Sequence, residues 1–331
     1  MPKTRITIIG CGFMGTVFGY AIKAHMPEAE VIGHDKDQSY GKRAESAKAI
    51  DKHQWNLPSA CEKAALVLLC IPSDGVEITL KTIGRDLSAG AIIVDLSGQA
   101  LQGHELAKRY VPDDVVFVSS SLIYHPDLVP VGTPVTAAKA EMLRGAMWPL
   151  VPRTGTSPTA SDSLAGLVTQ LGATPLFMDA AEHDGLAMSV DMLPNLLGSA
   201  LMLAVSKDGA WRDRQWMAGS TFSEITESVE RTAALPKALL TQKIAAVHWL
   251  NQTMLQLMAM RDAISADDLS ALESMLTEAR EQREHWLNDW RKGRDDGRGQ
   301  PYQPPSLLGS FLGQGLAQRF SERGKNESKK K

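Results

Sequence analysis

Short apolar runs rich in β-branched residues alternate with helix-like segments along the first half of the chain. Runs of this kind are typical of strands that are buried on both faces of a parallel sheet. Proline, glycine, serine or aspartate follows several of them and predicts a turn at the strand end. The pattern therefore predicts a doubly wound α/β fold, with strands at residues 5–9, 30–33, 64–71, 91–94, 115–118 and 175–178.

The pattern changes after Asp179, where apolar residues recur at the helical spacing of three and four. One such set is Leu269, Leu272, Leu276 and Ala279, and the segment 265–268 before it resembles a capping box that opens a helix. From residue 292 onward, glycine, proline and charged residues dominate. We therefore expect a Rossmann-type domain at 1–179, an all-α domain at 180–291 and a polar basic tail at 292–331.

The composition is that of a folded globular protein, with 44% hydrophobic and 22% charged residues. It excludes a disordered chain, a collagen and a disulfide-stapled mini-protein. The net charge is −3, but residues 291–331 carry ten Lys/Arg and only four Asp/Glu. The acidic remainder argues against a nucleic-acid-binding surface. The tail is expected to be solvated, with a weak contact to a polyanion as the alternative.

The three cysteines, Cys11, Cys61 and Cys70, are scattered and form no Cys-x-x-Cys pair. No zinc site or redox pair is therefore expected, and we expect no metal. Reduced thiols are typical of a cytoplasmic protein. The chain enters its first strand within five residues, and no apolar run approaches 18 residues, so neither a signal peptide nor a membrane segment is expected.

A glycine-rich loop, Gly10-Cys11-Gly12-Phe13-Met14-Gly15, follows the first strand and opens a helix. This is the context of a dinucleotide-binding fingerprint: the first glycine makes the tight turn, the second admits a pyrophosphate and the third packs the helix on the strand. All six residues are predicted to bind the cofactor. Asp35 lies twenty residues beyond Gly15, where a carboxylate accepts ribose hydroxyls and repels a 2′-phosphate. The predicted cofactor is NAD rather than NADP.

Ligands of such sheets lie at the carboxyl ends of the strands, where several small polar residues of this chain are expected. Pro72 and Ser73 are predicted to bind the cofactor. Ser97 is a catalytic candidate and Ser121 a substrate-binding candidate, because their loops should cover the nicotinamide half and the substrate. The alternative is that all four are ordinary turn residues.

Further segments resemble the prephenate dehydrogenase family over residues 5–262. Phe117-Val118 followed by His125-Pro126 is similar to the family's F-V-x-x-H-P segment, and residues 182–184 with Leu193-Pro194 resemble its E-H-D and L-P helix. Residues 218–222 resemble its A-G-G-G-F stretch. The resemblance implies a Rossmann domain followed by a helical dimerisation domain. It also implies NAD-dependent oxidative decarboxylation of prephenate, arogenate or a related cyclic acid in tyrosine biosynthesis.

The resemblance points to His125 as the catalytic group that takes the proton of the ring hydroxyl, a task that suits a near-neutral pKa. Because the His-Pro pair lies four residues later than the family spacing, Ser121 is the alternative for that position. A purely structural loop histidine is the other alternative. Asn195 and Thr221 are the substrate-binding candidates of the second domain.

The second domain also departs from the family pattern. Met192 and Asn195 replace two histidines, and Ser223 and Glu227 replace arginines. A substrate carboxylate without its arginine loses roughly 1.5–3 kcal/mol of charge-assisted hydrogen bonding. An imine reductase with Asp191 as proton donor, a 3-hydroxyacid-type dehydrogenase and a non-catalytic NAD-binding regulator are therefore alternative functions.

Methionine-rich helices of the second domain predict a homodimer. Their apolar faces could instead pack within the chain, and the sequence does not separate the two arrangements. The methionines concerned are Met188, Met192, Met202, Met254 and Met258.

Overall fold

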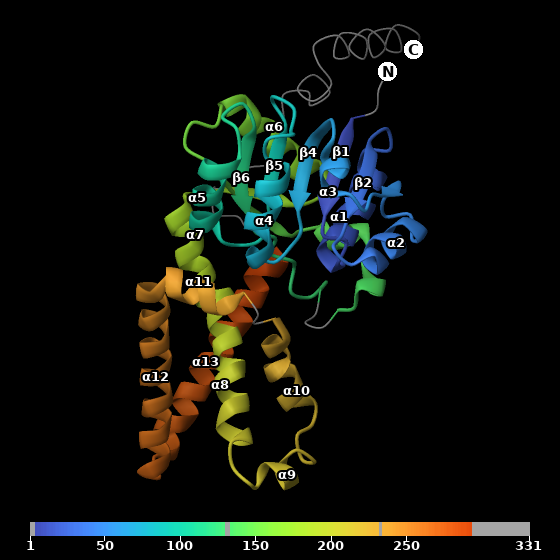
Figure 1. Ribbon diagram of the computed structural model, residues 1–331. Coiled ribbons are helices and arrows are strands. Elements are labelled where there is room, and N and C mark those ends of the chain that lie inside the picture. Colours follow the sequence, from blue (N-terminus) through green and yellow to red (C-terminus); the bar gives the residue numbers. More distant parts are fainter. Residues whose placement is uncertain (1–3, 130–132, 232–233, 293–331) are drawn as a thin grey trace, which may run out of the picture. The chain divides into compact units, whose positions relative to one another are not determined.

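The computed structural model describes residues 4–129, 133–231 and 234–292. The chain divides into two compact units, a first one whose described residues are 4–129 and 133–180, and a second one that runs from residue 181 to the end of the described chain. Each unit is described by itself below, with the elements labelled as in Figure 1. The predicted polar tail lies outside the described residues, except for Lys292.

Eight strands within the described residues form one sheet in the first unit, in the order β3-β2-β1-β4-β5-β6-β7-β8. All neighbouring strands are parallel except β6 and β7, which are antiparallel. The predicted fold class is confirmed by this mostly parallel sheet and by the helical second unit. In chain order the strands are Arg5–Ile9, Glu30–His34, Lys52–His53, Ala64–Leu69, Ile92–Asp95, Val116–Ser120, Met147–Pro152 and Thr174–Phe177.

Both faces of the sheet are buried, because successive side chains of a strand point to opposite sides. Leu66 and Leu68 of β4 contribute to one apolar cluster, whereas Val67 and Leu69 contribute to the other. Residues of α1 and α6 complete the first cluster, and residues of α4 and α5 complete the second. The helices and 3-10 turns of this unit are α1 Phe13–His25, α2 Gln38–Ser46, α3 Leu57–Cys61, α4 Ser73–Ile83, α5 Ala100–Tyr110, η1 Val135–Ala137, η2 Ala140–Leu143 and α6 Pro158–Gln170.

The sequence pattern missed two strands of this sheet. β3 has two residues, too few to show a periodicity. β7 contains Pro149 and Pro152, and proline argues against a strand inside a sheet because it donates no ladder hydrogen bond. In the structure β7 is nevertheless an inner strand, paired with β6 on one side and β8 on the other.

The second unit is helical throughout its described residues (Figure 1). α8 packs closely against α10 and η4, since a Cβ atom on Gly198 would lie 2.8 Å from the Ile225 carbonyl oxygen. The elements are α7 Ala180–Ala187, the π-helical turn η3 Met188–Met192, α8 Leu193–Ser206, α9 Trp211–Arg214, α10 Ser220–Thr226, the 3-10 turn η4 Glu227–Arg231, α11 Leu235–Thr241, α12 Lys243–Ser265 and α13 Leu269–Lys292.

The capping box predicted at 265–268 is wrong in its detail. Ser265 is the last residue of α12, so its side chain does not open the next helix. Asp268 instead caps α13, because its Oδ1 accepts a hydrogen bond of 3.0 Å from the backbone N–H of Ala271. Aspartate is as good an N-cap as serine, and the tight turn between the helices places it at that position.

One helical stretch among the described residues, Ala180–Ser206, is long and apolar enough to cross a membrane by length and composition alone. No apolar run of the sequence had predicted such a segment. A single match is weak evidence, because core helices of soluble proteins meet the same criteria.

Candidate functional site

The glycine-rich loop joins β1 to α1 and has no spare volume at two of its three glycines. Gly10 has φ +97°, and a Cβ atom there would lie 2.3 Å from the Cys70 carbonyl oxygen. A Cβ atom on Gly15 would lie 1.9 Å from the Gly10 carbonyl oxygen. Nothing lies within 4 Å of a Cβ atom on Gly12. The loop is therefore tightly packed on the protein side and open at Gly12.

The first turn of α1 offers an anion-binding end. Gly12 is the N-cap and supplies no side-chain hydrogen bond, and the first turn carries no acidic residue. The N–H groups of a helix's first turn have no partner within the helix, and the helix dipole adds positive potential there. The open space at Gly12 and these donors fit a diphosphate group. Phe13 and Met14 flank it with half-buried side chains.

Asp35, which follows β2, is tied to this loop by hydrogen bonds. Its Oδ2 accepts from the backbone N–H of Cys11 at 2.8 Å, and its Oδ1 accepts from the backbone N–H of Asp37 at 2.9 Å. A carboxylate has about four lone-pair sites, so each oxygen keeps acceptor capacity for a hydroxyl. The half-buried carboxylate thus lies where a ribose next to the diphosphate would present its hydroxyls.

The cysteines near the loop are packing residues and do not act as nucleophiles. Burial, followed by the negative charge of Asp35, raises the pKa of Cys11 to about 12. Burial also raises the pKa of Cys70, which follows β4, well above its ordinary value. A thiol must ionise to react or to bind a metal, so both remain inert at neutral pH.

The loops after β4, β5 and β6 lie at the same edge as the glycine-rich loop, because parallel strands end together. Pro72 is the N-cap of α4 and Ser73 is its buried first residue. Asp95, at the end of β5, accepts a hydrogen bond of 3.1 Å from the backbone N–H of Ser97.

Ser97 and Ser121 are brought together by Gly98. The Gly98 N–H donates to the Ser120 carbonyl at 3.1 Å. A Cβ atom on Gly98 would lie 4.0 Å from the Ser121 Cβ. The two serines that the sequence singled out on different strands therefore belong to one local group.

His125 lies further along the same segment. Its Nδ1 accepts a hydrogen bond of 3.2 Å from the backbone N–H of Asp127, and its carbonyl accepts from the N–H groups of Leu128 and Val129. A Cβ atom on Gly145, just before β7, would lie 3.8 Å from the His125 ring. The structure thus places Ser121 beside the loop of Ser97, and His125 beside the start of β7.

Two residues that the sequence analysis did not select also lie at this edge. Asp95 is 1% exposed and holds the Ser97 loop. The ring of Tyr124 contacts the ring of Phe13 edge-on, with 5.8 Å between the centroids. For Tyr124, the sequence shows only an aromatic residue directly before the His-Pro pair. That position does not reveal which residue the ring contacts.

Asn195 and Thr221 belong to the second unit. The Asn195 amide donates to the Asp191 carbonyl at 2.5 Å, next to the π-helical turn η3. Turns of this kind occur frequently at functional sites. Thr221 is exposed in the first turn of α10. Both side chains lie on elements that pack together, α8 and α10.

His183 and Asp184 form a buried pair in α7. The His183 Nδ1 lies 2.8 Å from the Asp184 Oδ1, and the two side chains are 3% and 2% exposed. A buried carboxylate that accepts from a ring nitrogen fixes the orientation of the imidazole. Both side chains are therefore buried, and they do not form an exposed cap at the start of α7.

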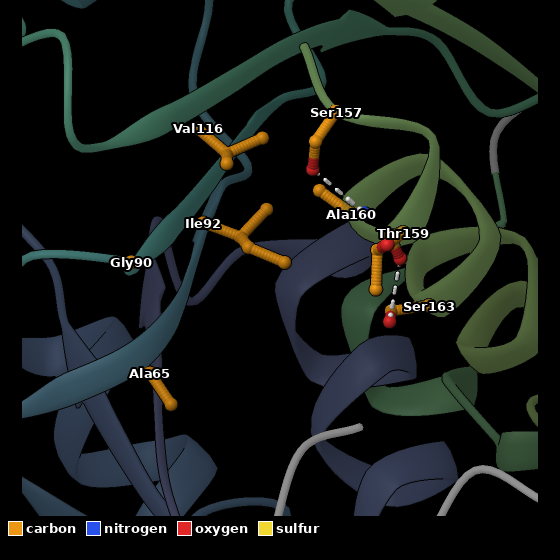
Figure 2. Close-up of a pocket in the computed structure, with 8 residues that line it drawn as sticks. All are labelled: Ala65, Gly90, Ile92, Val116, Ser157, Thr159, Ala160 and Ser163. Carbon is orange, nitrogen blue, oxygen red and sulfur yellow. Dashed lines mark hydrogen bonds between the residues drawn. The ribbon is translucent and has the colours of Figure 1, made fainter.

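A cavity of about 310 Å³ lies elsewhere in the first unit, at the amino ends of β4, β5 and β6 (Figure 2). Both serine hydroxyls at the cavity already have partners: Ser157 Oγ accepts from the Ala160 N–H at 3.2 Å, and Ser163 donates to the Thr159 carbonyl at 2.8 Å. No charged residue is among its lining residues, and it is at the opposite edge from the glycine-rich loop. The lining residues are Ala65, Gly90, Ile92, Val116, Ser157, Thr159, Ala160 and Ser163.

The sheet order, the open Gly12 and the tethered Asp35 define the class of the first unit as a dinucleotide-binding domain of the Rossmann type. Residues 18–176 match the family model of the prephenate dehydrogenase nucleotide-binding domain. Because this match spans just under half of the chain, it shows that the nucleotide-binding domain is similar to that of the prephenate dehydrogenase family.

Curated relatives agree with that similarity. The chain is 24% identical to prephenate dehydrogenase of Bacillus subtilis over 60% of its own length and 53% of that protein. It is 25% identical to cyclohexadienyl dehydrogenase of Zymomonas mobilis over 61% of its length and 67% of that protein. The chain therefore spans only about half to two thirds of the relatives that it matches.

Solved structures show the same fold. Prephenate dehydrogenase from A. aeolicus, in complex with hydroxyphenyl propionate and NAD+, superposes with a TM-score of 0.72 at 17% identity, covering 86% of this chain and 99% of that one. Synechocystis arogenate dehydrogenase gives a TM-score of 0.64 at 20% identity, covering 86% and 100%.

Proposed function

We propose that the protein is an NAD-dependent dehydrogenase of the prephenate dehydrogenase type, which decarboxylates prephenate, arogenate or a related cyclic acid oxidatively. The observation that carries the proposal is the open Gly12 beside the Asp35 carboxylate, at the edge where the loop of Ser97 lies next to Ser121. The bound dinucleotide would supply the hydride acceptor. The family of the nucleotide-binding domain supports the substrate class, and a place in tyrosine biosynthesis follows from that class.

NAD is proposed in preference to NADP because of Asp35. Its carboxylate is held by the N–H groups of Cys11 and Asp37 and cannot turn away from a ribose. A 2′-phosphate would bring negative charge against this carboxylate. Lys36, the neighbouring residue, is exposed and is the nearest cation in sequence.

The chain's own part in the reaction is to hold the substrate and to move one proton. The ring carbinol loses its hydride and its hydroxyl proton, the ring carboxylate departs as carbon dioxide, and the electrons of the broken bond make the ring aromatic. We propose His125 as the group that takes the hydroxyl proton and returns it to the phenol oxygen. Ser97 would donate a hydrogen bond to the hydroxyl. Ser121 is the alternative partner, because it lies beside the Ser97 loop.

Asn195 and Thr221 are proposed to bind the substrate. Acidic side chains on the adjoining turns η3 and η4, Asp191 and Glu227, favour a substrate that carries a cationic group in addition to its carboxylates. Arogenate, with its amino group, fits this charge better than prephenate. Asp191 also supports an imine reductase as the second candidate function, in which its carboxyl group would act as the proton donor.

The deciding experiment has two assays. NAD reduction is measured with arogenate and with prephenate, and NADH oxidation is measured with a panel of cyclic imines. We expect NADH to form in the presence of arogenate. Both His125→Asn and Ser121→Ala should lower the rate, and the variant with the larger loss identifies the residue that takes the proton. Turnover of imines alone would replace the proposal. Tight NAD binding without turnover of any substrate would indicate a non-catalytic regulator.

A homodimer formed by the second unit is also proposed. Met188 and Met192 are buried inside the unit, at 1% and 4% exposure, so they do not serve a partner. Met254 and Met258 of α12 are about half exposed together with neighbouring leucines. A cytoplasmic location agrees with the protonated thiols of the first unit and is proposed with it.

A further inference from the structure

Tyr124 carries a buried hydroxyl group that lacks a hydrogen-bond partner among the described residues. Leaving such a group unpaired destabilises a folded chain, and native structures pair most of them. Two other tyrosines of this unit are paired: Tyr20 donates to the Ala47 carbonyl and Tyr110 to a Glu77 carboxylate oxygen, each at 3.2 Å. The Tyr124 hydroxyl differs from these two, and a bound ligand would supply the partner that it lacks among the described residues.

The neighbours of Tyr124 come from the two segments that surround the dinucleotide site. Phe13, in the first turn of α1, meets the Tyr124 ring at an interplanar angle of 67°. Cys70 follows β4 and lies close enough to raise the pKa of the phenol further, after the larger effect of burial. Neither an aromatic ring nor a protonated thiol is a strong acceptor. The phenol therefore stays protonated and able to donate.

The backbone holds this side chain in place. Ile123 and Met147 exchange two backbone hydrogen bonds of 2.9 Å, one in each direction. The bridge fixes the segment next to Tyr124 to the start of β7. The side chain is thus supported on one side by the sheet and on the other by the Phe13 ring.

The order of the strands in the sheet indicates which half of a bound dinucleotide would lie next to Tyr124. Asp35 follows β2, which marks the adenosine side, and the diphosphate lies over the loop after β1. The other half then extends toward β4, β5 and β6. Tyr124 follows β6 and contacts the loop from that side.

We propose that the Tyr124 hydroxyl binds the cofactor: it donates a hydrogen bond to the nicotinamide riboside half of the bound dinucleotide. The inference rests on the proposed function and adds a cofactor-binding residue to it. The hydroxyl oxygen is buried in this structure, so the proposed bond requires a shift of the side chains that cover it.

Calorimetric titration of the full chain with NADH and with ADP tests the proposal. ADP keeps the adenosine and both phosphates and lacks the nicotinamide riboside. Tyr124→Phe keeps the ring packed on Phe13 and removes only the hydroxyl. We expect NADH to bind about fivefold to tenfold more weakly, the loss typical of one hydrogen bond, and ADP to bind as it does to the wild type.

Tyr20→Phe is the matched control, because it removes a hydroxyl that is bonded within the chain, and both its affinities should equal those of the wild type. Thermal unfolding verifies that the variants are folded, and Tyr124→Phe should be at least as stable as the wild type without ligand. Unchanged NADH affinity in Tyr124→Phe, or equal weakening of NADH and ADP, would overturn the inference while the proposed function stands. Wild-type protein that binds neither ligand would overturn both.

Discussion

The two units of this chain differ in how far they bury their apolar residues. In the first unit the strands are buried on both faces, and side chains such as Phe18 and Trp148 are fully covered. In the second unit the buried apolar cluster is small, and long stretches of α12 are exposed, with Ile244 at 83% and Leu257 at 57%.

The difference indicates how each unit is stabilised. A sheet between two helical layers completes its own core, so the first unit can hold glycines and carboxylates in fixed positions at its edge. A helix that is apolar on an exposed face needs a further surface to cover it. The first unit therefore provides a preorganised site, and the second is expected to depend on association.

The largest expected effect is at the glycine of the first unit that has open space. Gly12→Val would place a side chain where the diphosphate is proposed to lie, and we expect NAD affinity to fall by roughly a hundredfold or more. Since nothing lies within 4 Å of a Cβ atom there, the unfolding temperature should change little. Calorimetry and thermal unfolding measure the two quantities.

Gly185→Ala is the matched control for that prediction, because Gly185 in α7 of the second unit also has nothing within 4 Å of a Cβ atom. It should leave NAD affinity unchanged. Normal NAD binding by Gly12→Val would show that the diphosphate does not approach this loop.

The next effect concerns the exposed face of the second unit. Leu257→Glu introduces a charge on α12 at a position that the chain itself leaves exposed. If that face is covered by a second copy, the variant should dissociate to monomers at protein concentrations about tenfold or more above those of the wild type, since a buried unpaired charge is strongly unfavourable. Sedimentation velocity over a concentration series measures the shift.

Gln256→Glu adds the same charge one position earlier and should have a smaller effect if the interface is centred on the leucine side of the helix. A wild-type protein that is monomeric throughout the series would refute the proposed dimer and leave the exposed leucines unexplained.

A moderate effect is expected at Asp35. Asp35→Asn keeps an acceptor for the Cys11 N–H but removes the negative charge. NAD should bind about tenfold more weakly, because hydrogen bonds to a charged acceptor contribute about 1.5–3 kcal/mol, and NADP should bind relatively better. The ratio of the two dissociation constants is the measurement. A ratio equal to that of the wild type would remove Asp35 from cofactor selection.

The smallest effect is the alkaline pH dependence of stability. The pKa values of Cys11 and Cys61 are raised to about 12 in the folded chain, mainly by burial. Above the ordinary thiol pKa of about 9, the unfolded chain loses protons that the folded chain keeps. The free energy of unfolding should therefore be unaffected below that value and fall above it, by about 1.4 kcal/mol per pH unit for each such thiol.

Urea unfolding between pH 8 and about 10.5 measures this slope. Cys61→Ala should lower the stability by a constant amount and make the slope shallower by one thiol. An identical slope in both proteins would show that Cys61 ionises in the folded chain as well.

Much of the first unit was predictable because its signals are local. The strand, the glycine-rich loop, the helix and Asp35 all lie within the first 35 residues. The glycines are required there by the backbone conformation and close packing of the loop, and the aspartate by its charge. β7 was not predictable from its residues, since Pro149 and Pro152 argue against a strand that only its neighbours on both sides stabilise. The helix cap at Asp268 was missed for a related reason, because the exact turn between α12 and α13 decides which side chain reaches the open N–H.

The type of fold, the position of the glycine-rich loop and the acidic residue paired with it can all be predicted from the residues alone, because their spacing along the chain encodes them. Three other relations emerge from the folded chain alone: Ser121 lies beside the loop of Ser97, His125 lies beside the start of β7, and the Tyr124 ring, whose hydroxyl is buried, contacts Phe13. These relations join residues from different strands. They depend on how the sheet brings strand ends together, which no local pattern of residues specifies.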